Sequence, residues 1–593
     1  MLFFKHDEKK ARERKKKYLR NLYTEAGERL AAEPDRIPWD VYPRPLLKRA
    51  EWLNLNGTWE FENDGVEATG IRVPFCPESI LSGIGEEIRP GSALRYTRRF
   101  TVPESWRGKR VLLHFGGVSC MCGVSLNGRT AGFFSNGYAP FTAEVTDLVK
   151  VGDENVLSVT AVNDISDIYP HGKQKENRGG MWYTPVSGIW QTVWLEPVPE
   201  KYVSGLEITA DLEGADIVLN ERLSGTAVCC GKEYPIRDGK VRIEPENPEK
   251  WTPENPKLYP FTVRCMGDEF ESYFALRTLS VGEFEGKKRL FLNGKPYFFN
   301  GILDQGYFSD GIYTPAEPGE YTRDILLAKA LGFNMLRKHI KTEPDFFYAE
   351  CDRLGIAVFQ DMVNNGAYSF FRDTLLPTVG LQKLKDRRRN SRKSAREEFE
   401  KAVEKTVARL KNHPCICYWT VFNEGWGQFD ADRFYNKVKG LDGTRFVDAT
   451  SGWFRQKESD VESLHIYFRK LPKKAAAVAA AGAGAGAASR PLVVSEFGGY
   501  VWKCEEHSFN VKKTYGYRIF KTRDAFTAAL ADLYLSQVVP LAREGLSAAV
   551  YTQLSDVEDE TNGLVTYDRK VVKVTPEEMR RVREALEEAA KGV

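Results

Sequence analysis

The stretch Tyr418-Trp-Thr-Val-Phe-Asn-Glu-Gly-Trp426 decides the fold of this chain. Its first five residues are aromatic or β-branched, the types that favour strands, and the apolar run stops at Asn423 and Glu424. Such a run is typical of a parallel strand covered on both faces, although a helical segment fits the same five residues. A buried strand-end carboxylate has the raised pKa that a general acid needs. The alternative is a carboxylate at the N-terminus of the next helix.

A second stretch, Leu492-Val-Val-Ser-Glu-Phe-Gly-Gly499, has the same pattern of a short apolar strand followed by Glu and Gly. The chain between Glu424 and Glu496 is long enough for a few βα units. The strand ends of a parallel barrel meet at one mouth, where barrel enzymes carry their catalytic groups. Paired carboxylates there are the groups that hydrolyse glycosidic bonds. The two stretches therefore predict one site with two glutamates.

Alternating strands and helices begin at about residue 281, which is the pattern of βα units. The predicted strands are Tyr297–Leu303, Asn334–His339, Ala357–Asp361, Ile416–Phe422, Phe446–Ala449, Leu464–Tyr467, Leu492–Glu496 and Ala548–Leu554. The predicted helices between them include Tyr321–Leu331, Pro344–Leu354, Arg396–Lys411 and Ala525–Glu544. This order predicts a C-terminal (β/α)₈ TIM barrel over residues 281–593.

The chain before the barrel is predicted to be β-rich behind a basic arm. Residues 1–50 form the arm, in which Lys9–Arg20 is predicted to be helical and either to dock on the body or to mediate assembly. Residues 51–197 show short alternating strands between Asn-Gly and Asp-Gly turns, which indicates a jelly roll or sandwich. Residues 198–280 are interpreted as a second small sandwich that acts as a spacer.

Several motifs together resemble glycoside hydrolase family 2, the β-galactosidase, β-glucuronidase and β-mannosidase superfamily. They are the two glutamate stretches, Gly188–Glu196, Trp251–Tyr259 and Gly332–His339, and the resemblance covers about residues 50 to 593. It implies a multidomain β plus α/β fold: an N-terminal jelly-roll sugar-binding domain, an immunoglobulin-like β-sandwich and the catalytic barrel. It also implies that the loop Asn163–Gly188, which contains His171, Arg178 and Trp182, reaches over the barrel mouth.

The resemblance also implies roles for the site residues. Glu496 would be the nucleophile, Glu424 the acid/base, and Asn423 the partner of the sugar 2-hydroxyl. Tyr467 would donate a hydrogen bond to the nucleophile, and Arg337 would hold Glu496 ionised. Further side chains predicted to contact sugar, or to pack beside it, are His339, Asp304, Asp361, Trp182, Trp426 and Trp453.

The loop after the eighth strand is expected to enter the pocket and set substrate choice. Its acidic residues would repel a uronic acid, and the loop lacks the Asn-x-Lys pair of the glucuronidases; the residues are Asp556, Glu558, Asp559, Glu560 and Asn562. A neutral sugar is therefore expected, with β-galactosidase-like activity first. β-Mannosidase, β-glucosidase, β-glucuronidase and arabinosidase activity stay open. So does a catalytically inactive carbohydrate-binding homologue.

Composition restricts the partners. The 85 basic and 82 acidic residues are too balanced for a nucleic-acid protein, and no run approaches a membrane span. The ten cysteines form no CxxC pair, so no metal site is expected, and no cofactor is expected either. The N-terminal residues do not resemble a signal peptide, so a reducing cytoplasm is the expected location. The segment Lys474–Arg490 is rich in alanine and glycine, with no catalytic role expected. A glycoside or oligosaccharide substrate and a homo-oligomer are the expected partners.

Overall fold

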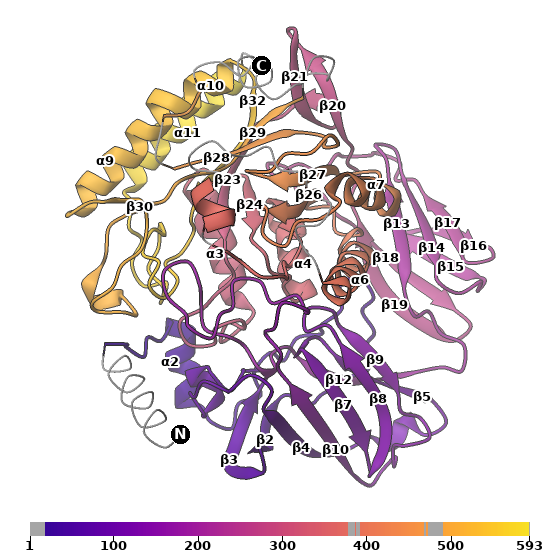
Figure 1. The fold of residues 1–593 in the computed structure, drawn as a ribbon. Coiled ribbons are helices and arrows are strands. Elements are labelled where there is room, and N and C mark those ends of the chain that lie inside the picture. Colours follow the sequence, from indigo (N-terminus) through magenta and orange to yellow (C-terminus); the bar gives the residue numbers. More distant parts are fainter. Residues whose placement is uncertain are drawn as a thin grey trace.

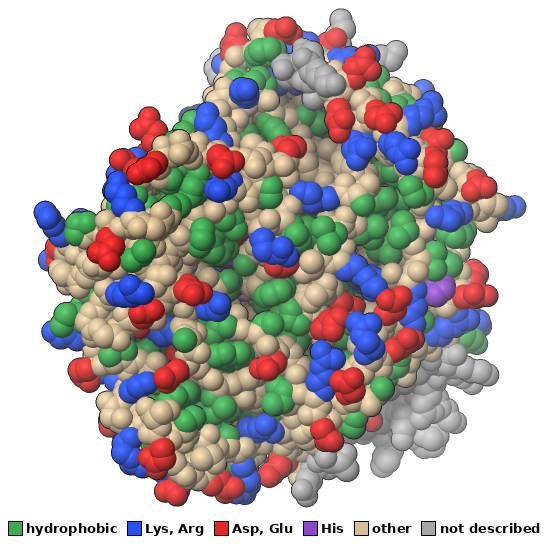
Figure 2. Space-filling model, turned by 180° about the vertical axis from the view of Figure 1, so that it is seen from behind, with side chains coloured by type: hydrophobic (Ala, Val, Ile, Leu, Met, Phe, Trp, Pro, Cys, Tyr) green, Lys and Arg blue, Asp and Glu red, His purple; other side chains and the backbone are tan. Residues whose placement is uncertain are grey.

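The structure is a computed structural model. It describes residues 18–369, 371–376, 386, 392–467, 470–472 and 490–591. The predictions for the N-terminal basic helix and for the alanine- and glycine-rich segment fall almost entirely outside the described residues. Figure 1 shows the β-rich N-terminal part of the chain beside the barrel, with the jelly roll in purple and the last helices of the barrel in yellow. Figure 2 shows basic and acidic side chains interspersed over the face behind that view.

The described part of the basic arm lies against the barrel. Leu19 forms a β-bridge with Asn510. Helix α2, Glu25–Ala32, begins after Thr24, whose hydroxyl accepts a hydrogen bond from the Gly27 amide. Thr24 also donates through its amide and its hydroxyl to Asp310, at 2.9 and 2.8 Å. Residues 18–32 are therefore attached to the loop that follows the first barrel strand.

The jelly roll consists of two facing antiparallel sheets. Their orders are β3-β2-β4-β10-β7-β8 and β1-β12-β5-β9, and a short β6-β11 pair joins them. Alternate residues along β2 and β10 are buried, as a half-buried strand requires. The strands are β1 Leu53–Asn54, β2 Gly57–Asn63, β3 Val66–Val73, β4 Ala93–Thr101, β5 Arg110–Phe115, β6 Val118–Ser119, β7 Met121–Leu126, β8 Arg129–Ser135, β9 Phe141–Glu144, β10 Glu154–Val162, β11 Gly188–Ile189 and β12 Val193–Val198.

A second sandwich of seven strands follows, with its own buried core. Its sheets are β13-β14-β17 and β16-β15-β18-β19, and a three-stranded sheet β20-β21-β22 leads from it into the barrel. The bounds are β13 Leu206–Ala210, β14 Ala215–Leu219, β15 Gly225–Cys229, β16 Lys232–Ile236, β17 Lys240–Ile243, β18 Tyr259–Cys265, β19 Asp268–Phe274, β20 Leu279–Phe284, β21 Lys287–Leu292 and β22 Lys295–Pro296.

The C-terminal domain is a parallel barrel of eight strands, as predicted. The order is β27-β26-β25-β24-β23-β32-β29-β28, and β27 contacts β28 to close it. The strands are β23 Phe299–Asp304, β24 Met335–Lys338, β25 Ala357–Asp361, β26 Ile416–Asn423, β27 Phe446–Ser451, β28 Glu462–Ile466, β29 Leu492–Gly498 and β32 Leu546–Thr552. Every residue of β26 and β29 is buried, which explains their continuous apolar runs.

The outer helices are α3 Gly319–Ala330, α4 Asp345–Leu354, α6 Lys393–Leu410, α7 Ala431–Leu441, α9 Arg523–Leu533, α10 Val539–Arg543 and α11 Pro576–Lys591. Shorter elements are η1 Ile80–Ser82, η2 Glu104–Trp106, η3 Phe371–Leu375, η4 Glu505–His507, η5 Tyr534–Val538 and the pair β30 Tyr500–Val501 and β31 Arg518–Ile519. The helix predicted over Ala525–Glu544 is divided by the π-helical turn η5.

One helical run corrects the expectation that no segment approaches a membrane span. Among the described residues, Arg523–Arg543 is long and apolar enough to cross a membrane by length and composition, with a mean hydropathy of 1.3. In this fold 56% of the 18-residue window that meets this test is buried, and α10 contacts β32 and α11. Its apolar character is therefore explained by its place between the barrel sheet and the last helix.

Candidate active site

The two glutamates meet at the mouth formed by the C-terminal ends of the barrel strands. A carboxylate oxygen of Glu424, one of Glu496 and a ring nitrogen of His465 all lie within 4.8 Å of one another. Glu424 follows β26 directly, and its backbone has a φ of +53°, a value that non-glycine residues adopt at a cost. The Glu424 amide donates to the carbonyl of Ser451 at 3.0 Å, which attaches this turn to β27.

Glu496 lies in an enclosed, positively charged environment. Its side chain is 6% exposed, whereas that of Glu424 is 18% exposed. The Tyr467 hydroxyl donates to one Glu496 oxygen, and Arg337 Nη1 donates to the other at 3.1 Å. Burial alone would raise the pKa of Glu496, but the charges of His465, Arg337 and His339, with the Tyr467 bond, lower it to about 2. Glu496 is thus held ionised, as a nucleophile must be.

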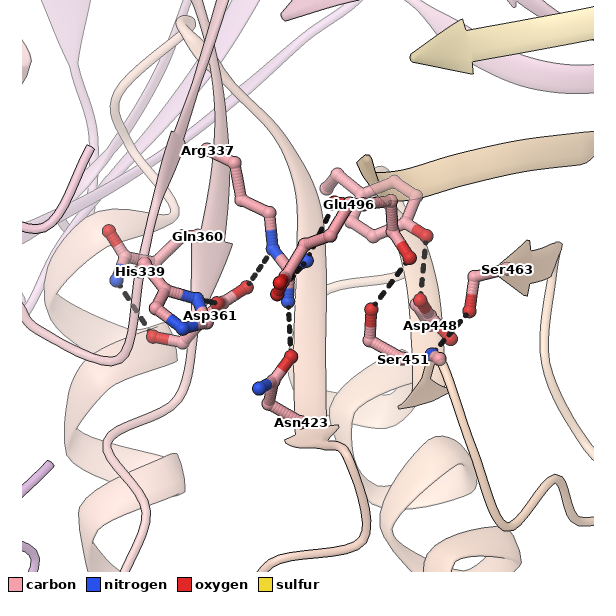
Figure 3. Close-up of polar contacts among 12 residues, drawn as sticks. Arg337, His339, Gln360, Asp361, Asn423, Asp448, Ser451, Ser463 and Glu496 are labelled. Carbon is pink, nitrogen blue, oxygen red and sulfur yellow. Dashed lines mark hydrogen bonds and ion pairs between the residues drawn. The ribbon is translucent and has the colours of Figure 1, made fainter. Parts of the chain in front are cut away.

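Arg337 joins three strand ends through one buried guanidinium group, as Figure 3 shows. Besides Glu496, it donates through Nε to Asp361 Oδ1 at 3.0 Å and through Nη2 to Asn423 Oδ1 at 2.8 Å. A planar cation with five donors suits this role better than a lysine would. His339 Nδ1 lies 2.7 Å from the other Asp361 oxygen. The structure therefore brings Arg337, His339 and Asn423 together at the strand ends, and the roles predicted for them stay predictions.

Two predicted sugar ligands have internal partners instead. Asp361 is 1% exposed and its two oxygens bond Arg337 and His339. Asp304 bonds Lys338 Nζ at 2.5 Å and the Gly306 amide at 2.8 Å. Strand-end position predicts proximity to the mouth, but it does not reveal which partner a carboxylate takes. Both carboxylates are therefore paired within the protein, and their predicted contact with sugar stays a prediction.

The loop from the jelly roll does reach the barrel mouth. Backbone amides of His171 and Gly172 donate to the Asn364 carbonyl at 3.1 and 3.2 Å, and purple loops of the jelly roll approach the barrel in Figure 1. Trp182 packs edge to face against Trp426, with ring centroids 5.2 Å apart. Trp426 itself is 4% exposed, so packing is its main contribution. Trp453 is half-buried, and its ring centroid lies 6.1 Å from that of His465.

The acidic loop after β32 corrects the expectation that its charges stand in the pocket. Its four carboxylates and Asn562 are at most 4% exposed. Glu558 bonds Arg178 Nη1 at 3.1 Å and the Thr184 amide at 2.8 Å, and both partners belong to the jelly-roll loop.

The other carboxylates of this loop have partners too. Asp556 bonds Lys573 Nζ at 2.8 Å, and Asp559 accepts from Asn510 at 2.7 Å. Glu560 accepts from the Tyr183 hydroxyl, and from the Asn562 amide at 3.0 Å. Burial raises the pKa of Asp556, Glu558 and Glu560. The acidic loop thus fastens the jelly-roll loop to the barrel.

The sequence prediction missed His465 as a site residue. Its Nδ1 lies 2.8 Å from Glu424 Oε1, its Nε2 lies 3.1 Å from Ser451 Oγ, and its side chain is fully buried. The motif His465-Ile466-Tyr467 carried a usable signal. Because side chains two positions apart in a strand share a face, His465 points to the same side as Tyr467.

Glu424, His465 and Glu496 are also the one group of three, among the residues that the structure describes, whose donor atoms are close enough to surround a metal ion. The positive charge of Arg337 in the site opposes the binding of a metal ion. Arg337 Nη1 lies 3.1 Å from Glu496 Oε1 and 3.5 Å from His465 Nε2, so a bound cation would meet a fixed guanidinium. The arrangement suits proton transfer and nucleophilic attack better than metal binding.

The fold and the site define a class: a (β/α)₈ barrel with two carboxylates at its mouth, preceded by β-sandwich domains. The model "Glycosyl hydrolases family 2, TIM barrel domain" matches residues 285–581, and "Glycosyl hydrolase 2 galactose-binding domain-like" matches residues 89–188. The chain belongs to glycosyl hydrolase family 2.

Its relatives differ in the sugar named for them. The chain is 24% identical to a β-galactosidase of Thermoanaerobacter pseudethanolicus over 421 residues, which are 65% of this chain and 53% of that protein. It is also 24% identical to a β-glucuronidase of Bacteroides fragilis over 359 residues, 56% of this chain and 49% of that protein. The chain therefore spans about half the length of these two relatives.

Two solved structures share the fold over nearly their whole length. A β-D-glucuronidase of Dictyoglomus thermophilum superposes with a TM-score of 0.72 at 18% identity, covering 92% of this chain and 98% of that one. A β-galacturonidase of Eisenbergiella tayi superposes with a TM-score of 0.66 at 19% identity, covering 94% and 99%. The agreement of fold extends over all three bodies of the chain.

Proposed function

We propose that this protein is a retaining exo-glycosidase that releases one β-linked neutral sugar from a non-reducing end. The observation that carries the proposal is the carboxylate pair: oxygens of Glu424 and Glu496 lie within 4.8 Å of each other at one mouth. Retaining enzymes need their carboxyl groups about 5–5.5 Å apart, because one of them must attack carbon directly. An inverting enzyme would need room for a water molecule between them.

The environments of the two carboxyl groups assign their roles. Glu496 is ionised and nearly enclosed, so its oxygen attacks C1 of the sugar while the glycosidic bond breaks. Glu424, the more exposed of the two, gives its proton to the departing oxygen. In the second step Glu424 takes a proton from water, and the water oxygen displaces Glu496 from C1. Asn423, held by Arg337, is placed to bond the 2-hydroxyl of the sugar.

A neutral sugar is favoured by the loop after β32. The residue two positions after Asn562 is Leu564, which is fully buried, so the loop carries no Asn-x-Lys pair for a substrate carboxylate. We place β-galactoside first among the neutral substrates. β-Mannoside, β-glucoside and arabinoside are the other neutral substrates to be compared with it.

A uronic acid substrate is the second candidate, and a specific observation favours it. The acidic loop is satisfied internally, so it does not repel an anionic sugar as the sequence predicted. The ammonium of Lys173, on the jelly-roll loop, opposes the rise in the pKa of Glu560 that burial causes. Lys173 Nζ lies 6.0 Å from the Trp182 ring centroid, on the loop that reaches the barrel mouth, where its positive charge would favour a substrate carboxylate.

The test is a panel of 4-nitrophenyl β-glycosides of galactose, mannose, glucose and glucuronic acid, with an α-L-arabinofuranoside, assayed with wild type and Glu496→Gln. Hydrolysis of one neutral glycoside that disappears in the variant supports the proposal. Preference for the glucuronide supports the second candidate. An inactive wild type supports a carbohydrate-binding role, which a calorimetric titration with the free sugars would then measure.

We also propose a cytoplasmic location. All ten cysteines lie in the described part of the chain and are free thiols, nine of them buried or half-buried. Buried free thiols accord with a reducing compartment.

A further inference from the structure

His465 lies between the two carboxyl groups of the site. It is on β28 beside Glu496 of β29, with which it pairs in register. Its Nδ1 is 2.8 Å from Glu424 Oε1, whereas its Nε2 is 3.6 Å from Glu496 Oε1, which is too long for a hydrogen bond. His465 is therefore bonded to the proposed acid/base and only adjacent to the proposed nucleophile.

The imidazole ring is held in one orientation. Gly452, with a φ of +86°, packs its backbone against the ring, and a Cβ there would lie 2.6 Å from a ring carbon. Ser451 Oγ is 3.1 Å from Nε2 and also contacts Ser495 Oγ at 3.0 Å (Figure 3 shows the position of Ser451). Because the ring cannot rotate away from these neighbours, its contact with Glu424 is a fixed part of the site.

Both ring nitrogens of His465 face hydrogen-bond acceptors. Ser451 Oγ donates its one proton to Ser495 Oγ, so at 3.1 Å from Nε2 it accepts a hydrogen bond from that nitrogen. Nδ1 faces the Glu424 carboxyl group at 2.8 Å and donates to Oε1. These contacts suit a ring that is protonated on both nitrogens, and its Nδ1–H donates to Glu424 Oε1 whether or not Glu424 carries its own proton. Four groups on four other barrel elements face this ring: Glu424, Glu496, Arg337 and Ser451.

This bond has a consequence for acid catalysis. An oxygen that accepts an N–H at 2.8 Å is a poorer place for the carboxylic proton than the other oxygen of the same group. The transferable proton of Glu424 is thereby directed to its second oxygen, away from His465. Without the bond, the carboxyl group can rotate and present either oxygen to the leaving group.

We propose that His465 is the positioning residue of the acid/base: it binds Glu424 Oε1 and so places the transferable proton on the oxygen next to the leaving group. This rests on the proposed glycosidase function. In the first step the proton goes from Glu424 to the glycosidic oxygen, the C1–O bond breaks and a Glu496 oxygen bonds C1. In the second, Glu424 takes a proton from water and the water oxygen displaces Glu496. His465 keeps its Nδ1 proton in both, so the steps balance without it.

The experiment compares two leaving groups on the sugar identified by the panel. A 2,4-dinitrophenolate departs without a proton, whereas an alkyl alcohol requires one. For His465→Gln in the full chain, kcat/KM should fall about 100-fold on the alkyl glycoside and by about 3-fold on the dinitrophenyl glycoside. His465→Asn keeps an amide at the level of Nδ1 and should recover part of the alkyl activity. Azide should raise kcat of His465→Gln on the dinitrophenyl glycoside, because azide can displace Glu496 from C1 in the second step without a general base.

His413 offers a matched control at the opposite end of the barrel. It is also buried, and its Nδ1 lies 2.7 Å from a carboxylate, that of Asp352. His413→Gln should change kcat/KM on both substrates by the same factor. Equal losses on the two substrates for both His465 variants would overturn the inference, since they indicate a structural role alone. If His465→Gln does not fold, the ratio in His465→Asn decides. A wild type inactive on both substrates would instead overturn the proposed function.

Discussion

Replacing Arg337 with methionine removes the one cation that touches Glu496, Asp361 and Asn423 together. The pKa of Glu496 is lowered from 4.5 to about 2 in the folded protein, with Arg337 among the main causes. That difference corresponds to about 3 kcal/mol in favour of the ionised carboxylate. Glu496 is buried, and burial disfavours its ionised form. Without the guanidinium of Arg337, fewer positive charges oppose this effect, so the pKa of Glu496 should rise.

The expected result is a change in the pH dependence of kcat/KM, which reports the free enzyme. In the wild type, ionisation of Glu496 should produce no acidic limb above about pH 4. In Arg337→Met the pKa of Glu496 rises, so an acidic limb should appear near or above pH 4.5, the ordinary value for this glutamate. Unfolding free energy should fall by about 3–5 kcal/mol, the cost of leaving buried carboxylates unpaired.

Initial rates on the best panel substrate between pH 3 and 8, with urea unfolding at pH 7, measure both effects. Arg581→Met is the control, because Arg581 is 67% exposed on α11 and should alter neither. An acidic limb in Arg337→Met identical to that of the wild type would refute the electrostatic argument, even if the variant were less stable.

Three further predictions concern other parts of the molecule. Tyr467→Phe removes the hydroxyl that orients Glu496 and should lower kcat about 100-fold. The control is Tyr534→Phe, which should leave kcat unchanged, because Tyr534 is buried and its hydroxyl has no partner among the described residues. Equal losses of kcat in the two variants would contradict the role of Tyr467. Arg178→Met breaks the buried pair with Glu558, so KM should rise, and limited proteolysis should cut the jelly-roll loop sooner than in wild type; an unchanged cleavage rate counts against this fastening. Burial and nearby Asp310 raise the pKa of Glu320 to about 8, so its contribution to stability is complete below about pH 4.5 and is lost as pH rises through about 8. Glu320→Gln should therefore raise the unfolding temperature more at pH 8 than at pH 5. An equal change in unfolding temperature at both pH values would exclude this titration.

The barrel could be predicted because its strands are buried on both faces. Continuous apolar runs such as those ending at Glu424 and Glu496 stand out from the alternating strands of the sandwiches. All eight predicted barrel strands overlap strands of the structure, in the predicted order. Helix ends were less predictable: the π-turn at Tyr534–Val538 contacts α11, and Tyr534 lies beside Tyr551 of β32, and these tertiary contacts leave no sign in local periodicity.

The sequence by itself determined the domain order, the barrel and the two glutamates, because chain connectivity and apolar patterning are local properties. Only the tertiary structure decided the partner of each polar side chain. Asp361 and Glu558 were expected to face substrate. Asp361 instead pairs with Arg337 on the neighbouring strand, and Glu558 pairs with Arg178, which lies 380 positions away along the chain. His465 was overlooked for the same reason, since its bond to Glu424 joins two strands that are not neighbours in the sheet. Burial makes an unpaired polar group costly, and the partner that it takes is fixed by folding in three dimensions rather than by sequence position.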